Sequence, residues 1–238
     1  MLDQTIHWME ITGTVVEGSL LVRILSLRLQ QVYLFVTLYV TVNLLIDIST
    51  LAVGTESDPA ARIFFYSRFI YALMYPMAAW DVFEEIKSQV VKVRKLNTPR
   101  LVSGLFLTAL LGFVFTMGLE DQNLKGTSSS MDFVGLFLWV GAASSSLLFT
   151  WNVWRMARKQ NVPSPRNTFV WAVYFTLTFG LAIVDCGFDV AGGLLPHLLL
   201  QISNIILISC DLLLDAWCLV SLRPLPSNLG SASEQASS

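Results

Sequence analysis

The chain has 238 residues, of which 54% are hydrophobic and 13% are charged, and its mean hydropathy is +0.62. Soluble domains carry about 25% charged residues, so the composition excludes an ordinary soluble domain. The net charge of −2 does not indicate a nucleic-acid partner. We therefore expect a multi-pass integral protein of a cytoplasmic or inner membrane, with the lipid bilayer as its main partner.

Long apolar stretches alternate with short polar connections along the chain. A helix needs roughly 20 mostly apolar residues to cross a bilayer, which leaves room for about seven spans. We predict spans at Ile6–Leu27, Val32–Val53, Arg62–Lys87, Leu101–Leu119, Asp132–Ala157, Thr168–Gly193 and Leu198–Leu222. The predicted fold is one all-α transmembrane bundle over residues 1–223. The small, polar tail 224–238 has nothing to bury and is expected to be disordered.

Basic residues are distributed unequally between the two sides of this threading. Twelve of the fifteen fall on one side: Arg23, Arg28, Lys87, Lys92, Arg94, Lys95, Arg100, Arg155, Arg158, Lys159, Arg166 and Arg223. The other side receives Arg62, Arg68 and Lys125. Because cytoplasmic loops carry an excess of Lys and Arg, we predict an outside N-terminus and a cytoplasmic C-terminus.

Ionisable residues inside the predicted spans are the candidate site residues. An Asp at a helix centre costs about 2.5–3.5 kcal/mol on insertion scales, so such groups usually face the bundle interior. The candidates are Glu17, Asp47, Arg68, Asp211 and Asp215. Asp47 and Arg68 each lie about 9 Å from the outer ends of consecutive spans, and we expect them to pair. The pair could belong to the site or act only as a structural clamp.

Polar residues form stripes on three of the predicted helices. The stripes are Glu10, Thr14 and Glu17 on the first, Asn43 and Asp47 on the second, and Asn204, Asp211 and Asp215 on the last. Stripes that face inward would give the bundle a carboxylate-rich core. Such a core is either a site or pathway for a cationic species, or a set of protonated carboxyl groups that hydrogen-bond helices together.

Known enzyme motifs do not account for these carboxylates. The pairs Asp185/Asp189 and Asp211/Asp215 have a spacing that can hold Mg²⁺ against a diphosphate. Their spans are predicted to be antiparallel, so the pairs would not converge on one ligand. The last predicted span contains no Lys for a retinal Schiff base, and no HExxH, GxSxG or phosphate-loop motif is present. We therefore expect no enzymatic activity, no cofactor and no metal site.

Two functions remain open from the sequence. The first is a non-enzymatic protein whose carboxylate-lined core binds or passes a proton, a cation or a small cationic solute. The alternative is a receptor-like sensor or accessory subunit that contacts a cytoplasmic protein or anionic lipid through basic inner loops. The residues for that contact would be Lys92, Arg94, Lys95, Arg158 and Lys159. A homo-oligomer is compatible with both functions.

Overall fold

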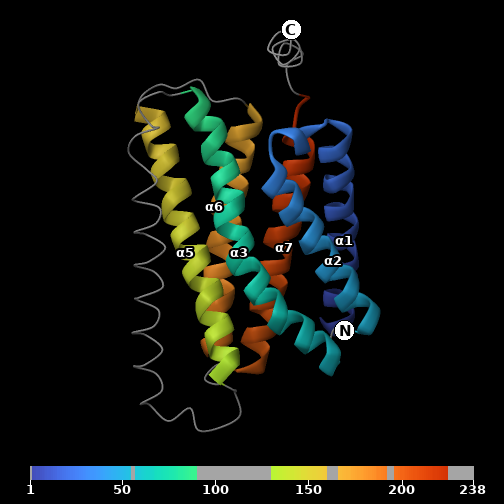
Figure 1. Ribbon diagram of the computed structural model, residues 1–238. Helices are drawn as coiled ribbons and strands as arrows, with labels where there is room; N and C mark the ends of the chain where they lie inside the picture. Colours follow the sequence, from blue (N-terminus) through green and yellow to red (C-terminus); the bar gives the residue numbers. More distant parts are fainter. Residues whose placement is uncertain (1, 55–56, 90–129, 160–165, 192–195, 225–238) are drawn as a thin grey trace.

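The computed structural model describes residues 2–54, 57–89, 130–159, 166–191 and 196–224, drawn as coloured ribbon in Figure 1. These residues form helices joined by turns and contain no strand. The helices are α1 (Leu2–Ser26), the 3-10 turn η1 (Leu29–Gln31), α2 (Leu34–Val53), α3 (Asp58–Gln89), α5 (Ser130–Lys159), α6 (Arg166–Ala191) and α7 (His197–Ser221). The predicted span Leu101–Leu119 and residues 225–238 of the predicted tail lie outside the described residues.

Four of the described helices are long and apolar enough to cross a membrane. These segments are Leu34–Val53, Gly135–Arg155, Arg166–Phe188 and Leu198–Ser221. The chain therefore has the helix composition of a multi-pass membrane protein. The predicted first and third spans are also helical, as α1 and α3, but polar and charged residues such as Glu10, Glu17 and Arg68 interrupt them.

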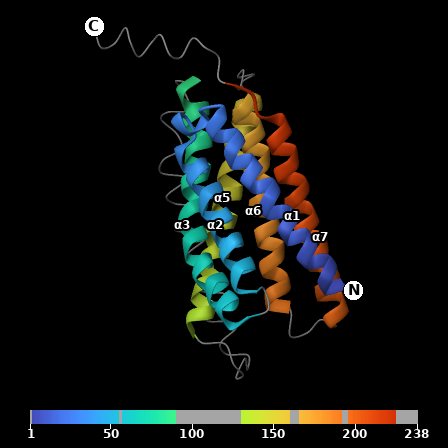
Figure 2. The ribbon, with the colours of Figure 1, turned by 90° about the vertical axis from the view of Figure 1, so that its right-hand side faces the viewer.

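The six α-helices of the described residues pack side by side in a ring. The order around the ring is α1, α2, α3, α5, α6 and α7. Each helix contacts the next, and α7 contacts α1. Figures 1 and 2 show that α1 and α7 run in the same direction, while α2 and α6 run against them. Helix α3 changes direction part-way along (Figure 1) and contains Pro76, which removes one backbone hydrogen bond from the helix.

The two ends of the ring differ in charge. We call one end of the ring the turn end; it is where residues 27–33 connect α1 to α2. The opposite end, which contains the start of α1 and the last turn of α2, is called the far end. The helix directions bring these described arginines to the turn end: Arg23, Arg28, Arg155, Arg158, Arg166 and Arg223. Arg62 and Arg68 belong to the far-end half of α3.

The outer surface of the ring is rich in exposed apolar side chains. Examples are Val15, Leu45, Leu73, Leu177 and Leu213, each at least half exposed, and Val220, which is 79% exposed. Water-soluble monomers rarely expose a continuous apolar surface. Because the carboxylates of α1, α2 and α7 face inward instead, as described below, the distribution of polarity suits a lipid environment.

Aromatic and aliphatic side chains fill the bundle at the turn end. Trp171 and Phe175 at the start of α6 are fully buried, and Tyr33 is 1% exposed. The Trp171 ring lies 6.3 Å from the Tyr33 ring and 5.6 Å from the Tyr174 ring, measured between centroids. Tyr33 Oη and Thr168 Oγ1 share a hydrogen bond of 2.9 Å, so the phenol is satisfied inside this packing. We refer to Tyr33, Thr168, Trp171 and Phe175 as the turn-end core.

A carboxylate of α3 caps the start of α2. The first backbone N–H groups of a helix have no partner within the helix. Asp81 Oδ2 accepts hydrogen bonds from the backbone N–H groups of Phe35, over 2.5 Å, and Val36, over 3.0 Å. Tyr33, which precedes α2, makes no side-chain cap bond itself. Asp81 therefore supplies the cap from another helix and fixes α2 against α3.

We expect Asp81→Ala to destabilise the protein by about 1–3 kcal/mol, because it leaves two donors of α2 without their acceptor. The measurement is unfolding in detergent, followed by far-ultraviolet circular dichroism. Glu84→Gln is the matched control, since Glu84 lies on the exposed side of the same helix and bonds only locally to Trp80 Nε1. An Asp81→Ala protein as stable as this control would contradict the capping role.

Candidate functional site

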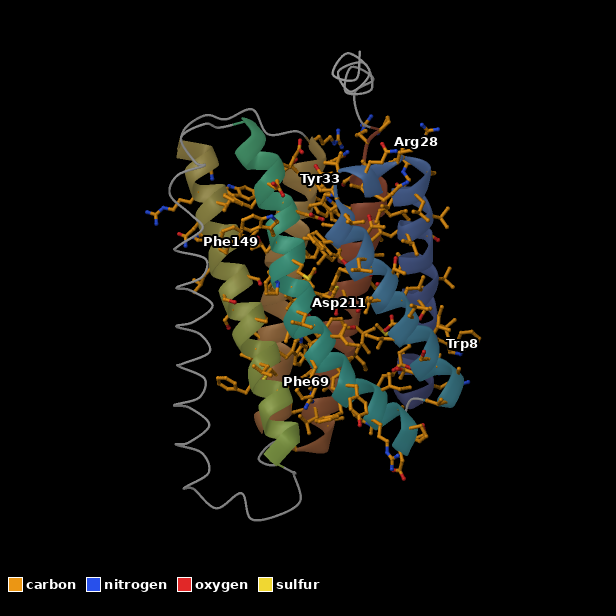
Figure 3. The ribbon with its side chains drawn as sticks, in the orientation of Figure 1. Trp8, Arg28, Tyr33, Phe69, Phe149 and Asp211 are labelled. Carbon is orange, nitrogen blue, oxygen red and sulfur yellow. The ribbon has the colours of Figure 1, made fainter. Side chains whose placement is uncertain are left out.

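The ring of helices contains a partly open cavity of about 360 Å³. Residues from all six helices line it: Met9, Glu10, Gly13, Thr14, Tyr39, Asn43, Ile46, Asp47, Thr50, Leu51, Phe64, Ser67, Tyr71, Tyr75, Trp139, Tyr174, Thr178, Leu181, Ala182, Asp185, Asn204, Leu207, Ile208, Asp211, Leu212 and Asp215. Its size falls at the low end of the ~300–1,000 Å³ range of small-molecule sites. Figure 3 shows Asp211 among the helices near mid-height.

Carboxyl groups dominate the charge of the cavity wall. Five of the lining residues are acidic, namely Glu10, Asp47, Asp185, Asp211 and Asp215, and none of the described lining residues is basic. Asp211 lies in the middle of α7, and its exposed side chain lines the cavity. The cavity thus concentrates carboxyl groups deep in the bundle.

A hydrogen-bonded chain links three helices beside this wall. Asn43 Nδ2 on α2 donates to Glu17 Oε1 on α1 over 2.6 Å, and the Tyr71 hydroxyl on α3 donates to Asn43 Oδ1. Glu17 itself is only 2% exposed. Each member fixes the next, so the Glu17 carboxyl is held in one position at the edge of the cavity.

The carboxyl groups of Glu17, Asp47, Asp211 and Asp215 lie near one another. Asp215 acts electrostatically on each of the other three, and Glu17 and Asp47 are direct neighbours. The Tyr174 hydroxyl donates to Asp215 Oδ1 over 2.8 Å, which orients that carboxyl. Neighbouring carboxylates repel one another unless a proton or another cation lies between them. The arrangement is therefore suited to holding positive charge.

The structure brings together four of the five residues expected to form the site and places the fifth differently. The Arg68 guanidinium carbon lies 4.9 Å from the Phe64 ring centroid and 6.0 Å from that of Trp139. Within the described residues, Asp47 and Arg68 do not form the expected ion pair. Asp47 lies next to Glu17 and Asp215 instead. Phe64 and Trp139 line the cavity, so Arg68 lies behind two of its wall residues.

Four tyrosines of the site were not anticipated from the sequence. Tyr39, Tyr71, Tyr75 and Tyr174 all line the cavity. The Tyr71 and Tyr75 rings stack at a centroid distance of 5.6 Å, and Tyr39 lies 6.3 Å and 6.0 Å from them. Tyrosines usually gather at membrane interfaces. These four tyrosines instead lie inside the helices, and Tyr71 and Tyr75 are one helical turn apart. That placement in the sequence could have indicated an aromatic group in the bundle interior.

Three buried oxygens at the site have no hydrogen-bond partner within the described part of the chain. Two belong to residues that line the cavity, namely Oγ1 of Thr178, which is 8% exposed, and Oε2 of Glu10. The third is Oε2 of Glu17, whose carboxyl is a direct neighbour of Asp47. Because unsatisfied buried polar atoms cost about 1–3 kcal/mol, such atoms mark positions where a ligand or water completes the structure.

Within the described residues, no group of three or more His, Cys, Asp or Glu side chains is placed to hold a metal ion. Asp185 from the first DxxxD pair and both Asp211 and Asp215 from the second line the cavity, so these three aspartates do meet there, although α6 and α7 run in opposite directions. Comparison with known protein families, with curated proteins and with solved structures finds no match to this chain. The function is therefore inferred from the residues of the site alone.

Of the basic residues expected to contact a cytoplasmic partner, the structure places Arg158. It is exposed at the turn end of α5, where Trp151, Trp154, Arg155 and Arg158 line a shallow hollow of about 310 Å³. Lys92, Arg94 and Lys95 lie outside the described residues, and the side chain of Lys159 is also outside them.

Proposed function

We propose that this protein is a non-enzymatic membrane protein whose carboxylate-lined cavity binds a proton, a cation or a small cationic solute and passes it along the bundle axis. The observation that carries the proposal is the convergence of Asp47, Asp211 and Asp215 on one cavity that no described basic residue lines. A cation bound there relieves the repulsion between the carboxylates, whereas an anion would increase it.

The shape of the cavity supports entry from one end. It extends from Glu10 and Phe64, in the far-end halves of α1 and α3, to Asp215. Asp215 is six residues before Ser221 at the end of α7, or about 9 Å from the turn end. The turn-end core fills the remaining depth. A ligand would enter from the far end, and passage across the bundle would require the turn-end core to rearrange.

The direct test is flux into proteoliposomes that contain the purified full chain. A pH-sensitive dye reports proton entry under a pH or potential gradient, and radiolabelled cations report solute uptake. Saturable uptake above that of protein-free liposomes supports the proposal. If neither protons nor cations bind to the protein or cross the membrane, the proposal is wrong.

We further propose that the turn end faces the cytoplasm, since the arginines gather there and cytoplasmic surfaces are basic. A reporter enzyme fused to the C-terminus should then be active only in the cytoplasm. A tag inserted between Asp121 and Ser130 should be labelled from outside in intact cells. Labelling that requires the membrane to be opened would reverse the orientation.

A receptor-like sensor is the second candidate, and the closed turn end favours it. A pocket open from one end with a packed core at the other can bind a ligand without passing it. The exposed Trp151 and Arg158 then lie on the side where a cytoplasmic protein or anionic lipid would be contacted. Ligand binding without any flux would favour this function over transport.

A further inference from the structure

We infer that the cavity recognises a small organic ammonium ion, a protonated or quaternary amine, rather than an inorganic cation. The inference deepens the proposed function and depends on it, because it names the ligand class of the same site. It is carried by the juxtaposition of acidic and aromatic side chains on one cavity wall.

The volume and the arrangement of the carboxylates argue against a bare metal ion. Ca²⁺ and Mg²⁺ need several oxygen ligands that converge at about 2.0–2.6 Å. Within the described residues no group of three or more His, Cys, Asp or Glu side chains is placed to hold such an ion. Instead, the carboxyl groups of Asp47, Asp185 and Asp211 come from three different helices around a space of about 360 Å³. That space suits a polyatomic cation.

The aromatic wall supplies the contact that an alkylammonium group requires. The faces of aromatic rings attract cations, and rings grouped around a pocket are the recurring recognition mode for quaternary ammonium groups. Tyr39, Tyr71 and Tyr75 form such a group, with centroids 5.6–6.3 Å apart. Trp139 Nε1 donates to the Tyr75 hydroxyl over 3.2 Å and so holds that ring in place. Methylated or alkylated nitrogen fits against these rings while its charge faces the carboxylates.

An independent feature points to a ligand at the same place. Thr178 lines the cavity, and its buried Oγ1 has no hydrogen-bond partner among the described residues. An amine N–H or a hydroxyl on the ligand would satisfy it. The charged head and a polar substituent of one small molecule would thus both find partners.

The experiment is isothermal titration calorimetry on the purified full chain, with choline as the probe. Its matched control is the uncharged isostere, in which a tert-butyl group replaces the trimethylammonium group. Sodium and potassium chloride are titrated in parallel, and proton flux is measured in proteoliposomes. We expect saturable binding of choline, no saturable binding of the isostere, and displacement of choline only by high concentrations of the inorganic salts.

Substitution of Tyr39 tests the aromatic contact separately. Its ring packs against Tyr71 and Tyr75 in the buried wall of the cavity. Tyr39→Leu should weaken choline binding by about 2- to 30-fold, which is the loss of affinity that corresponds to the free energy of one cation–π contact. Tyr39→Phe retains the aromatic ring and should keep the affinity. Circular dichroism confirms that each variant is folded. The comparison of choline with its isostere on the unmodified protein does not depend on either variant.

The outcomes separate this inference from the proposed function. If protons or sodium ions bind or pass and choline does not bind, the ammonium inference is wrong and the proposed function stands. If the isostere binds as well as choline, or if Tyr39→Phe loses as much affinity as Tyr39→Leu, recognition does not involve cation–π contact and the inference is overturned. If no cation binds or passes, both are wrong.

Discussion

Asp211→Asn is expected to abolish saturable uptake in proteoliposomes while the protein remains folded. Asp211 lies near the middle of α7 with its surface toward the cavity, and Asp47, Asp185 and Asp215 are its electrostatic neighbours. Asparagine keeps the size of the side chain but carries no negative charge. The cavity therefore loses attraction for a cation at its centre, and no packing contact is lost.

The stability of the variant separates a binding role from a structural one. Removing one of several neighbouring carboxylates lessens their mutual repulsion, so we expect the free energy of unfolding to stay the same or increase. Asp58→Asn is the matched control, because Asp58 is exposed in the first turn of α3 and does not line the cavity. If Asp211→Asn retains full uptake, the carboxylate serves only to hold helices together and the site is misassigned.

Trp171→Ala is expected to destabilise the protein by about 3–5 kcal/mol, the cost of truncating a large buried aromatic side chain. Trp171 is fully buried in the turn-end core and contacts the ring of Tyr33, which directly precedes α2, and rings of its own helix. Its removal leaves a void between α2 and α6 that these rings cannot fill without leaving their rotamers. The measurement is denaturant unfolding in detergent, monitored by circular dichroism.

Two further substitutions define what the Trp171 result means. Trp8→Ala removes the same side chain from an outward position, 61% exposed and visible at the edge of the bundle in Figure 3, and should change stability by no more than about 0.5 kcal/mol. Trp171→Phe, which retains a ring, should cost less than Trp171→Ala. Equal effects of Trp8→Ala and Trp171→Ala would show that the turn end is not a packed core.

The division of the bundle into a hollow half and a packed half bears on mechanism. Glu10, Asp47 and Asp211 line the cavity, whereas Tyr33, Trp171 and Phe175 are buried in the turn-end core. The Tyr33–Thr168 hydrogen bond and the Asp81 cap on α2 both stabilise the packed half. A transporter would have to break some of these contacts in each cycle, so variants at Tyr33 or Asp81 that alter flux more than binding would support transport over sensing.

The sequence alone determined the helices and the depth of their polar residues. Hydropathy is a local property, so the apolar runs predicted six of the described helices within a few residues of their ends. A fixed rise of 1.5 Å per residue likewise placed Asp47 and Arg68 at similar depth. The spacing of Asn204, Asp211 and Asp215 put them on one face of α7, and all three line the cavity.

Only the tertiary structure decided which faces meet. Depth along a helix follows from residue number, but rotation about its axis depends on the packing of neighbours, so equal depth did not make Asp47 and Arg68 a pair. Arg68 lies over Phe64 and Trp139, and Asp47 faces Glu17. The tyrosine group likewise exists only because α2 packs against α3. This packing brings the ring of Tyr39 into contact with the rings of Tyr71 and Tyr75, which are 32 and 36 positions away in the chain. No local pattern encodes that contact, since it arises from the closure of the helices into a ring.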